Sequence, residues 1–226
     1  MNESVLGQDV NNKSISLVLR RYLYLIVKRL FDIICGIIGI IFLIPIGMII
    51  KICYMIHGDF TSIYFVQNRI GKNGEEFKFY KFRSMVPNAD EVLFKLLDSN
   101  EELASEYKKN KKLKNDPRIT KIGRFIRKTS IDELPQLFNV LKGDMSMIGN
   151  RPYLPREKED MKEYYDDIIK TKPGITGYWQ VSGRSNIDFN SRCKLESYYS
   201  NHYGFRMDIK IFIMTCYVVL FGRGAE

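Results

Sequence analysis

Hydrophobic and polar positions divide the chain into one long apolar run near the N-terminus and a mixed region after it. Residues 33–50 carry no charge, and 18 residues are the lower limit for a helix that crosses a bilayer. Pro45 lies inside this run, where it removes a backbone hydrogen bond and crowds the preceding turn. Lysine and arginine mark the cytoplasmic side of a membrane. They flank the run at Arg20, Arg21, Lys28 and Arg29 and again at Lys51, Arg69, Lys72, Lys78, Lys81 and Arg83.

Basic residues on both flanks favour a re-entrant helix, one that enters a single leaflet, breaks at Ile44-Pro45 and returns to the same face. A single crossing is the alternative, because the run is long enough for it. A second apolar run, residues 211–221, is too short to cross and fits either an interfacial helix or a core helix. Residues 1–16 are polar and do not form a signal peptide.

The mixed region predicts one hairpin and several helices. Two segments rich in β-branched and aromatic residues, 62–70 and 75–85, flank an Asn73-Gly74 pair that favours a tight primed turn. Apolar positions at helical spacing predict helices over 88–112, 119–128, 132 or 135 to 141, and 155–170, and Gly143 would end the third. Residues 171–184 predict a loop. The fold class is therefore mainly α with a small β-hairpin (α+β).

Composition narrows the class of protein. Of 226 residues, 45% are hydrophobic and the net charge is +9, which excludes a disordered tail and a polytopic membrane protein. Residues 108–128 hold ten basic residues and one acid, so this stretch carries the whole excess charge. Four cysteines without C-x-x-C spacing and two histidines make a zinc site improbable and indicate reduced thiols.

The adjacent acids Asp132 and Glu133 are the candidate reactive groups. They lie between the basic run and a helix start at Pro135, where backbone N–H groups and cations would converge on a phosphate. A carboxylate can attack phosphorus and form an acyl phosphate. The structural alternative is a capping box, in which Ser130 caps a helix and Glu133 reaches back to the backbone.

The basic run has two parts. Its lysines, at 108–114, suit anionic lipid headgroups, and Arg118, Arg124 and Arg127 offer the planar paired donors that suit a diphosphate. A solvated helical face is the structural alternative, and nucleic acid is the other usual polyanion.

Several ordered blocks resemble the bacterial sugar transferases, the monotopic phosphoglycosyl transferases that act on polyprenol phosphate. The blocks span residue 28 to about residue 224 and, since many occur in order, the resemblance is specific. They are Lys28-Arg29-x-x-Asp32, Gln67-x-Arg69-x-Gly71, Lys81-Phe82-Arg83, Asp116-Pro117-Arg118-Ile119-Thr120, residues 123–137, residues 142–146, Pro173-Gly174-Ile175-Thr176-Gly177 and residues 180–184.

The resemblance implies a transferase at the cytoplasmic face of the cell membrane. Asp132 would attack the β-phosphate of a UDP-sugar, release UMP and pass the phosphosugar to undecaprenyl phosphate, with Mg²⁺ at Asp132 and Glu133. Arg127 and Arg151 would contact phosphate, with Arg118, Arg124 and Arg184 as weaker candidates. Trp179 would stack on uracil, or else serve in packing or as a membrane-interface anchor. The product would begin exopolysaccharide, capsule or other glycan assembly.

The implied partners are UDP-sugar, undecaprenyl phosphate and inner-leaflet anionic lipid, without nucleic acid; a homo-oligomer is left open. The expected division is a polar tail (1–19), a re-entrant membrane segment (20–56) and a cytoplasmic catalytic domain with a C-terminal interfacial helix (57–226). Asn150 and Glu196 depart from the family, which commonly has Pro and often Asp there. A non-catalytic membrane-tethered scaffold and a direct transfer without an intermediate are the alternatives.

Overall fold

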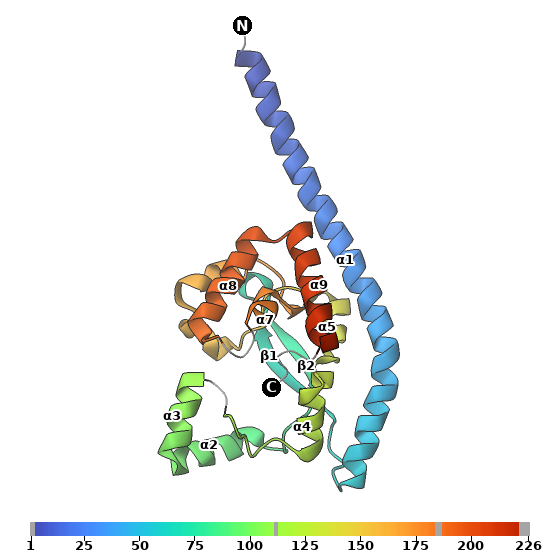
Figure 1. The fold of residues 1–226 in the computed structure, drawn as a ribbon, viewed down its shortest axis with the longest axis vertical. Coiled ribbons are helices and arrows are strands. Elements are labelled where there is room, and N and C mark those ends of the chain that lie inside the picture. The colour runs from blue at the N-terminus through green and yellow to red at the C-terminus, as the bar shows by residue number, and fades with distance from the viewer. Residues whose placement is uncertain (1–2, 111–112, 184–186, 222–226) are drawn as a thin grey trace.

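The computed structural model describes residues 3–110, 113–183 and 187–221, and places one long helix beside a small mixed body (Figure 1). The predicted fold class, mainly α with a small hairpin, is confirmed. In chain order the elements are α1 (Glu3–Ile56), β1 (Tyr64–Ile70), η1 (Lys72–Gly74), β2 (Glu76–Phe82), α2 (Ala89–Ser99), α3 (Glu101–Asn110), α4 (Lys121–Lys128), η2 (Ile131–Glu133), α5 (Gln136–Lys142), β3 (Ser146–Ile148), η3 (Pro155–Glu157), η4 (Glu159–Tyr164), α6 (Tyr165–Ile168), β4 (Gly174–Thr176), α7 (Tyr178–Ser182), α8 (Phe189–His202) and α9 (Phe205–Phe221).

The predicted hairpin is formed by β1 and β2. The strands pair antiparallel, from Tyr64 opposite Phe82 to Ile70 opposite Glu76. At the tip, Asn73 has a φ of 60° and Gly74 a φ of 82°. Positive φ at both central residues is what a primed turn requires, so the Asn-Gly prediction is confirmed.

The long helix α1 contains the whole apolar run and continues through Pro45 without ending there. Residues 16–56 are long and apolar enough to cross a membrane, and only 22% of the most apolar window is buried against the body. The helix also crosses the predicted boundary between residues 19 and 20. The predicted break at Ile44-Pro45 is therefore not seen as a helix end.

Polar contacts hold α1 to the body before its apolar run begins. Asp32 accepts hydrogen bonds from the Ser146 hydroxyl (3.0 Å) and the Met147 N–H (2.8 Å). Lys28 donates to the Ile148 carbonyl (2.8 Å) and pairs with Asp208. These contacts join the N-terminal helix to β3 and to α9.

Two further contacts complete the attachment of α1. Arg29 donates to the carbonyls of Val140 and Leu141 at the C-terminus of α5 (2.6 and 2.7 Å), where a cation also complements the helix dipole. Beyond the run, the Tyr54 hydroxyl donates to the Arg83 carbonyl just after β2, and Lys51 donates to the carbonyls of residues 60 and 61 in the connecting segment. Both ends of the apolar run are thus held by the same body, along which α1 lies (Figure 1).

Apolar packing continues the contact along the length of the helix. A buried cluster joins α1 to the hairpin region and α4, and consists of Leu43, Ile50, Tyr54, Ile63, Phe82 and Ile126. The opposite side of α1 remains exposed, with Ile37, Ile41, Ile44 and Ile52 more than half accessible. This exposed apolar side of α1 is what a membrane would cover.

The helix predicted over residues 88–112 is wrong as a single element, because it divides into α2 and α3. Asn100 between them is extended, with φ −146° and ψ 107°. Its side-chain oxygen accepts the Leu103 N–H (3.1 Å), so Asn100 caps the second helix and interrupts the first.

The helix predicted over residues 155–170 is also wrong as a single element. Pro155 does begin a helical turn, but the segment consists of η3, η4 and the four-residue α6. Lys162 has a φ of 49°, which no continuous helix allows. In the first turn, the buried Glu157 carboxylate accepts the Leu154 N–H (2.7 Å), so a side chain replaces regular helical bonding.

Residues 171–183 form more than the predicted loop. They contain α7 and β4, and β4 pairs parallel with β3, with Ser146 opposite Gly174 and Ile148 opposite Thr176. The two strands approach so closely that a Cβ at Gly174 would lie 2.0 Å from the Gly149 nitrogen. Only glycine fits there, and the short strands carry no alternating pattern that would have revealed them.

The C-terminal apolar run lies in α9, which begins six residues before it at Phe205. Ile211 is fully buried, whereas Phe212 and Ile213 are exposed. The helix therefore has a core side and an exposed apolar side.

Two predictions for α5 are confirmed: Gly143, with a φ of 93°, ends this helix, and Pro135 precedes it.

Replacing Asp208 tests the attachment of α1. Asp208 accepts hydrogen bonds from Tyr24 and Tyr199 (both 2.8 Å) besides pairing with Lys28, so Asp208→Ala leaves a poorly solvated cation and two hydroxyls without their acceptor. Loss of one partner from such a pair costs about 3–5 kcal/mol. Thermal unfolding in detergent should show a Tm about 10 °C lower. Asp166→Ala, at an exposed site, is the matched control, and equal Tm values for the two variants would refute the role.

Candidate active site

The two candidate acids lie on the short 3₁₀ turn η2 between α4 and α5. Asp132 is buried, with 8% of its surface accessible, and Glu133 is half-buried. Ser130 precedes them in the left-handed region (φ 57°), and its side chain caps no helix. The capping-box alternative is therefore wrong, and the Glu133 side chain is available for another contact.

Lys81 on β2 supplies that contact. Its ammonium nitrogen lies 2.8 Å from Glu133 Oε1 and 3.6 Å from Asp132 Oδ2, so one cation serves both carboxylates. Sequence reasoning did not place Lys81 in the site, although the Lys81-Phe82-Arg83 block was a signal that could have found it. The strand directs it there because Phe82, its neighbour, points to the core while Lys81 points to the opposite face.

The surroundings drive the pKa values of the two acids in opposite directions. Burial raises the pKa of Asp132, and the nearby Glu133 charge adds to this, against the lowering effects of Lys81 and Arg127. Burial also acts upward on Glu133, but Lys81, Arg151 and Gln136 outweigh it and lower the pKa of Glu133. Paired acids separated in this way typically divide the roles of an active site.

Arg127 and Arg151 lie near this pair of acids. Arg127 on α4 donates through Nε to the Ser84 hydroxyl (2.8 Å), and its charge acts on Asp132. Arg151, in the segment after β3, acts on Glu133. Both are placed where a phosphate next to the acids would meet a guanidinium group.

The remaining predicted arginines differ in their surroundings. Arg118 is buried and forms a two-pronged ion pair with Asp116 (2.6 and 2.8 Å), and its third donor meets the Ala89 carbonyl (3.3 Å). Those contacts are structural. Arg124 is exposed on α4, and Arg184 lies outside the described residues.

Comparison with known proteins decides the family. The family described as bacterial sugar transferase matches residues 23–222, which is most of the chain. The chain belongs to the bacterial sugar transferases.

The relatives of the chain carry names of transferases or of exopolysaccharide production. The chain is 46% identical over 201 residues to undecaprenyl-phosphate galactose phosphotransferase of Salmonella typhimurium, covering 88% of this chain and 41% of that protein. It is 47% identical over 215 residues to galactosyl transferase CpsE of Streptococcus agalactiae, covering 91% and 45%. Exopolysaccharide production protein ExoY of Sinorhizobium fredii is 37% identical over 202 residues, covering 88% and 87%. The chain thus spans less than half the length of the first two.

The acids of this sugar transferase offer a limited donor set for a metal ion. No group of three histidine, cysteine, aspartate or glutamate side chains that could hold a metal occurs within residues 16–108, 113–183 and 187–218, whose side chains the structure describes. Mg²⁺ does not need one, because it is held through one or two carboxylates together with substrate phosphates and water. The oxygen atoms of Asp132 and Glu133 fit that requirement.

Asn150 and Glu196 hold the segment that carries Arg151. Asn150 donates to the Ile168 carbonyl (3.1 Å), the Thr171 hydroxyl (3.3 Å) and the Ser200 hydroxyl (2.6 Å), so hydrogen bonds constrain the turn at the position where the family resemblance implies a proline. Glu196, fully buried, accepts the Arg151 N–H at 2.7 Å.

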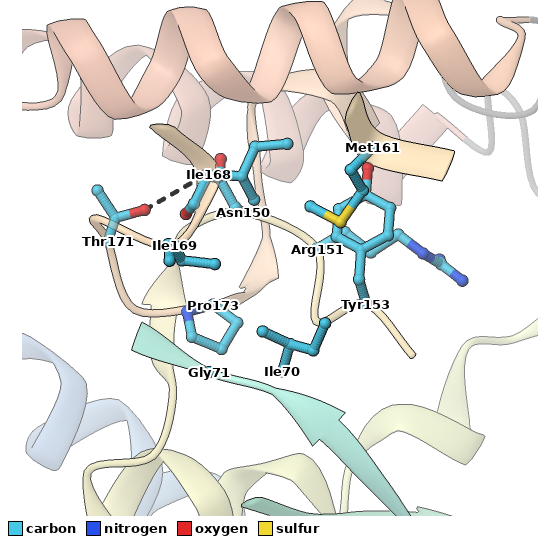
Figure 2. Close-up of a pocket in the computed structure, with 10 residues that line it drawn as sticks. All are labelled: Ile70, Gly71, Asn150, Arg151, Tyr153, Met161, Ile168, Ile169, Thr171 and Pro173. Carbon is cyan, nitrogen blue, oxygen red and sulfur yellow. Dashed lines mark hydrogen bonds between the residues drawn. The ribbon is translucent and has the colours of Figure 1, made fainter. Parts of the chain in front are cut away.

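A small hollow lies behind this segment, lined by Ile70, Gly71, Asn150, Arg151, Tyr153, Met161, Ile168, Ile169, Thr171 and Pro173. Figure 2 shows Asn150 bonded to Thr171 on one side of it, and the Arg151 guanidinium extending past Tyr153, away from the aliphatic residues. The backbone at 150–151 is therefore anchored in the hollow, whereas the arginine head group is directed out of it.

Asp132→Asn should stabilise the fold at neutral pH. The pKa of Asp132 is higher in the folded protein than in the unfolded chain, so folding disfavours its ionisation. The free energy of unfolding therefore falls as the pH rises from the pKa of Asp132 in the unfolded chain through its pKa in the folded protein. The amide imitates the neutral acid, so the variant should have a higher Tm at pH 7 and a Tm equal to wild type near pH 4, measured by thermal unfolding in detergent.

Asp166→Asn, exposed on α6, is the control and should change the Tm little at either pH. A Tm below wild type at pH 7 for Asp132→Asn would contradict the desolvation argument.

Proposed function

We propose that this sugar transferase moves a sugar 1-phosphate from a UDP-sugar to undecaprenyl phosphate, as the first membrane step of exopolysaccharide, capsule or other glycan assembly. The observation that carries the proposal is the buried Asp132 beside Glu133, with Lys81 on both carboxylates. The names of its relatives, among them a galactose phosphotransferase that uses undecaprenyl phosphate, support the same reaction class.

In the first step, an Asp132 oxygen attacks the β-phosphorus of the UDP-sugar. The new P–O bond forms as the bond from that phosphorus to the bridging oxygen breaks, and UMP leaves with the electron pair. The product is a phosphosugar on the aspartate, an acyl phosphate. The Asp132 carboxylate is in contact with little water, which favours its attack on phosphorus because little water has to be displaced before the reaction.

In the second step, a phosphate oxygen of undecaprenyl phosphate attacks the same phosphorus. The bond to Asp132 breaks, the carboxylate is restored, and the sugar is left on the lipid through a diphosphate. Arg127 and Arg151 would stabilise the negative charge on the transferring group from two separate elements. Mg²⁺ bound at Asp132 and Glu133 would supply further neutralisation of phosphate charge.

The membrane placement that fits best is a re-entrant one, with the body at the cytoplasmic face. Lys28 and Arg29 before the apolar run and Tyr54 after it all contact the same body. A helix that crossed the bilayer would carry one of those ends away from the body. Lysines at 108–114 would meet anionic lipid of the inner leaflet, although residues 111 and 112 lie outside the described residues.

The scaffold alternative is less favoured, since a scaffold does not need a buried aspartate whose ionisation opposes folding. Direct transfer without an intermediate would use the same acids and is separated only by experiment. A homo-oligomer is compatible with either reaction.

Asp132→Asn should abolish turnover. The amide cannot act as the nucleophile, so UMP release from UDP-sugars in the presence of undecaprenyl phosphate should fall at least about a thousandfold. With the lipid omitted, labelled phosphosugar should accumulate on wild-type protein and not on the variant. Asp166→Asn should behave as wild type. If UMP release strictly requires the lipid and no labelled protein accumulates, direct transfer is favoured. If Asp132→Asn releases UMP at an unchanged rate, the proposed enzyme mechanism is refuted.

Ser14→Cys tests the topology. In a re-entrant arrangement residue 14 stays on the cytoplasmic side with the body, so a membrane-impermeant maleimide should label it, above the background of the native cysteines, only after the cells are permeabilised. Ser99→Cys, at an exposed position on α2, is the control and should label in the same way. Labelling of residue 14, and not of residue 99, in intact cells would establish a crossing.

A further inference from the structure

Three arginines from distant parts of the chain gather around Arg151, and two of them contact Trp179. They are Arg69 on β1, Arg151 after β3 and Arg192 on α8. The guanidinium carbon of Arg192 lies 4.6 Å from the centre of the Trp179 ring, and that of Arg151 lies 5.8 Å from it. Burial and then the charge of Arg151 lower the pKa of both Arg69, to about 10, and Arg192. Arg151 is therefore close enough to repel both Arg69 and Arg192.

Each of these arginines has a buried donor that no group in the described part of the chain satisfies. The Nε atoms of all three arginines and the Nε1 atom of Trp179 are inaccessible to solvent and have no hydrogen-bond partner within the described residues. An unsatisfied buried donor is costly, and donors on charged groups are the costliest. Four such donors, on three arginines around Arg151 and on the tryptophan beside two of them, indicate a site shaped for acceptor atoms from outside the described part of the chain.

The nearby acids do not neutralise the cluster. Glu157 lies 4.0 Å from Arg69, at the limit of an ion pair. Glu196 uses one oxygen for the Arg151 backbone N–H, and burial raises the pKa of its carboxyl to about 7, so it carries only part of a charge at neutral pH. The cluster retains a net positive charge and suits a ligand with more than one negative charge.

The cluster adjoins the two acids. Glu133 lies within electrostatic reach of both Arg69 and Arg151. A ligand bound among the arginines would thus lie beside the site where the phosphosugar is transferred. Trp179 is only 9% exposed, which leaves little of its ring for a base to stack on. Its place beside Arg151 and Arg192 favours the packing alternative, with the ring supporting the guanidinium groups.

We propose that Arg69, Arg151 and Arg192 form one pocket for the phosphates of the nucleoside diphosphate, with Trp179 as its supporting wall. This inference rests on the proposed function and adds Arg69, Arg192 and Trp179 to the groups that bind the donor. After transfer the same pocket would hold the phosphate of the departing UMP. Arg69 and Arg192 would therefore act on the affinity for the nucleotide, whereas Arg151, which lies beside the acids, would also act on the chemical step.

Binding of UMP to the full-length protein in detergent tests the pocket without any turnover. Arg192→Gln removes one cation and its planar donors and should raise the Kd for UMP, measured by calorimetry, by about 10–100-fold. Arg192→Lys keeps the positive charge but cannot donate two parallel hydrogen bonds, so its Kd for UMP should lie between those of wild type and Arg192→Gln. Arg206→Gln, exposed on α9, is the matched control and should leave the Kd unchanged.

A second variant guards against a folding defect. Trp179→Phe retains an aromatic ring but removes the unpaired Nε1 donor, and its UMP affinity should fall a few-fold with an unchanged Tm. In UMP-release assays Arg192→Gln should raise the KM for UDP-sugar more than it lowers kcat.

Two results would overturn the pocket: an unchanged Kd for UMP in folded Arg192→Gln, or a rise confined to the KM for the lipid phosphate, which would assign the arginines to the acceptor. Failure of the proposed function is distinct, because wild type would then bind UMP in an Arg192-dependent way and yet release none from any UDP-sugar.

Discussion

Asp208 on α9 receives the Lys28 ammonium and two tyrosine hydroxyls, and this contact connects the first helix of the chain to the last. The same lysine donates to the carbonyl of Ile148, at the end of β3. Arg151 follows three residues later. A helix whose exposed side suits lipid therefore sets the position of a strand that leads directly to the arginine beside the acids.

The site itself is maintained against electrostatic cost. Asp132 is buried in a place that opposes its ionisation, and Lys81 offsets part of this by serving both acids. Arg151 repels both Arg69 and Arg192, and all three leave donors unsatisfied within the described residues. Such local destabilisation is typical of sites that are completed by a ligand, and the compact packing of Phe82, Ile126 and the α1 residues supplies the stability that tolerates it.

Sequence patterns predicted those features that depend on neighbouring residues. The Asn73-Gly74 turn, the Gly143 helix end and the apolar length of α1 follow from local backbone chemistry, and the structure has all three. The division of residues 88–112 was missed because the cap at Asn100 competes with a helical pattern that continues on both sides. The β3–β4 pair was missed because three-residue strands leave no periodicity, and their contact depends on glycines far apart in the chain.

The candidate site divides in the same way. Asp132 and Glu133 were identified from their neighbours in the sequence, Arg127 from its place in the basic run, and Arg151 only from the family resemblance. Lys81 could not be assigned to them without the fold, because 51 residues separate it from Asp132 and only the hairpin brings it there. Arg192 and Trp179 were still less predictable, since a lone arginine on a helix and a lone tryptophan beside a turn are usually packing residues.

The exposed apolar side of α1 also changes how this protein meets other molecules. A body held to a bilayer along one helix diffuses in two dimensions, and the frequency of its encounters with any lipid depends on the mole fraction of that lipid in the membrane. Bulk concentration governs only its water-soluble ligands. For a membrane-bound transferase with one lipid and one water-soluble substrate, the mole fraction in the membrane governs the first encounter and the bulk concentration governs the second. Dilution of the bilayer with inert lipid therefore slows the encounter with the lipid substrate and leaves the encounter with the soluble substrate unchanged.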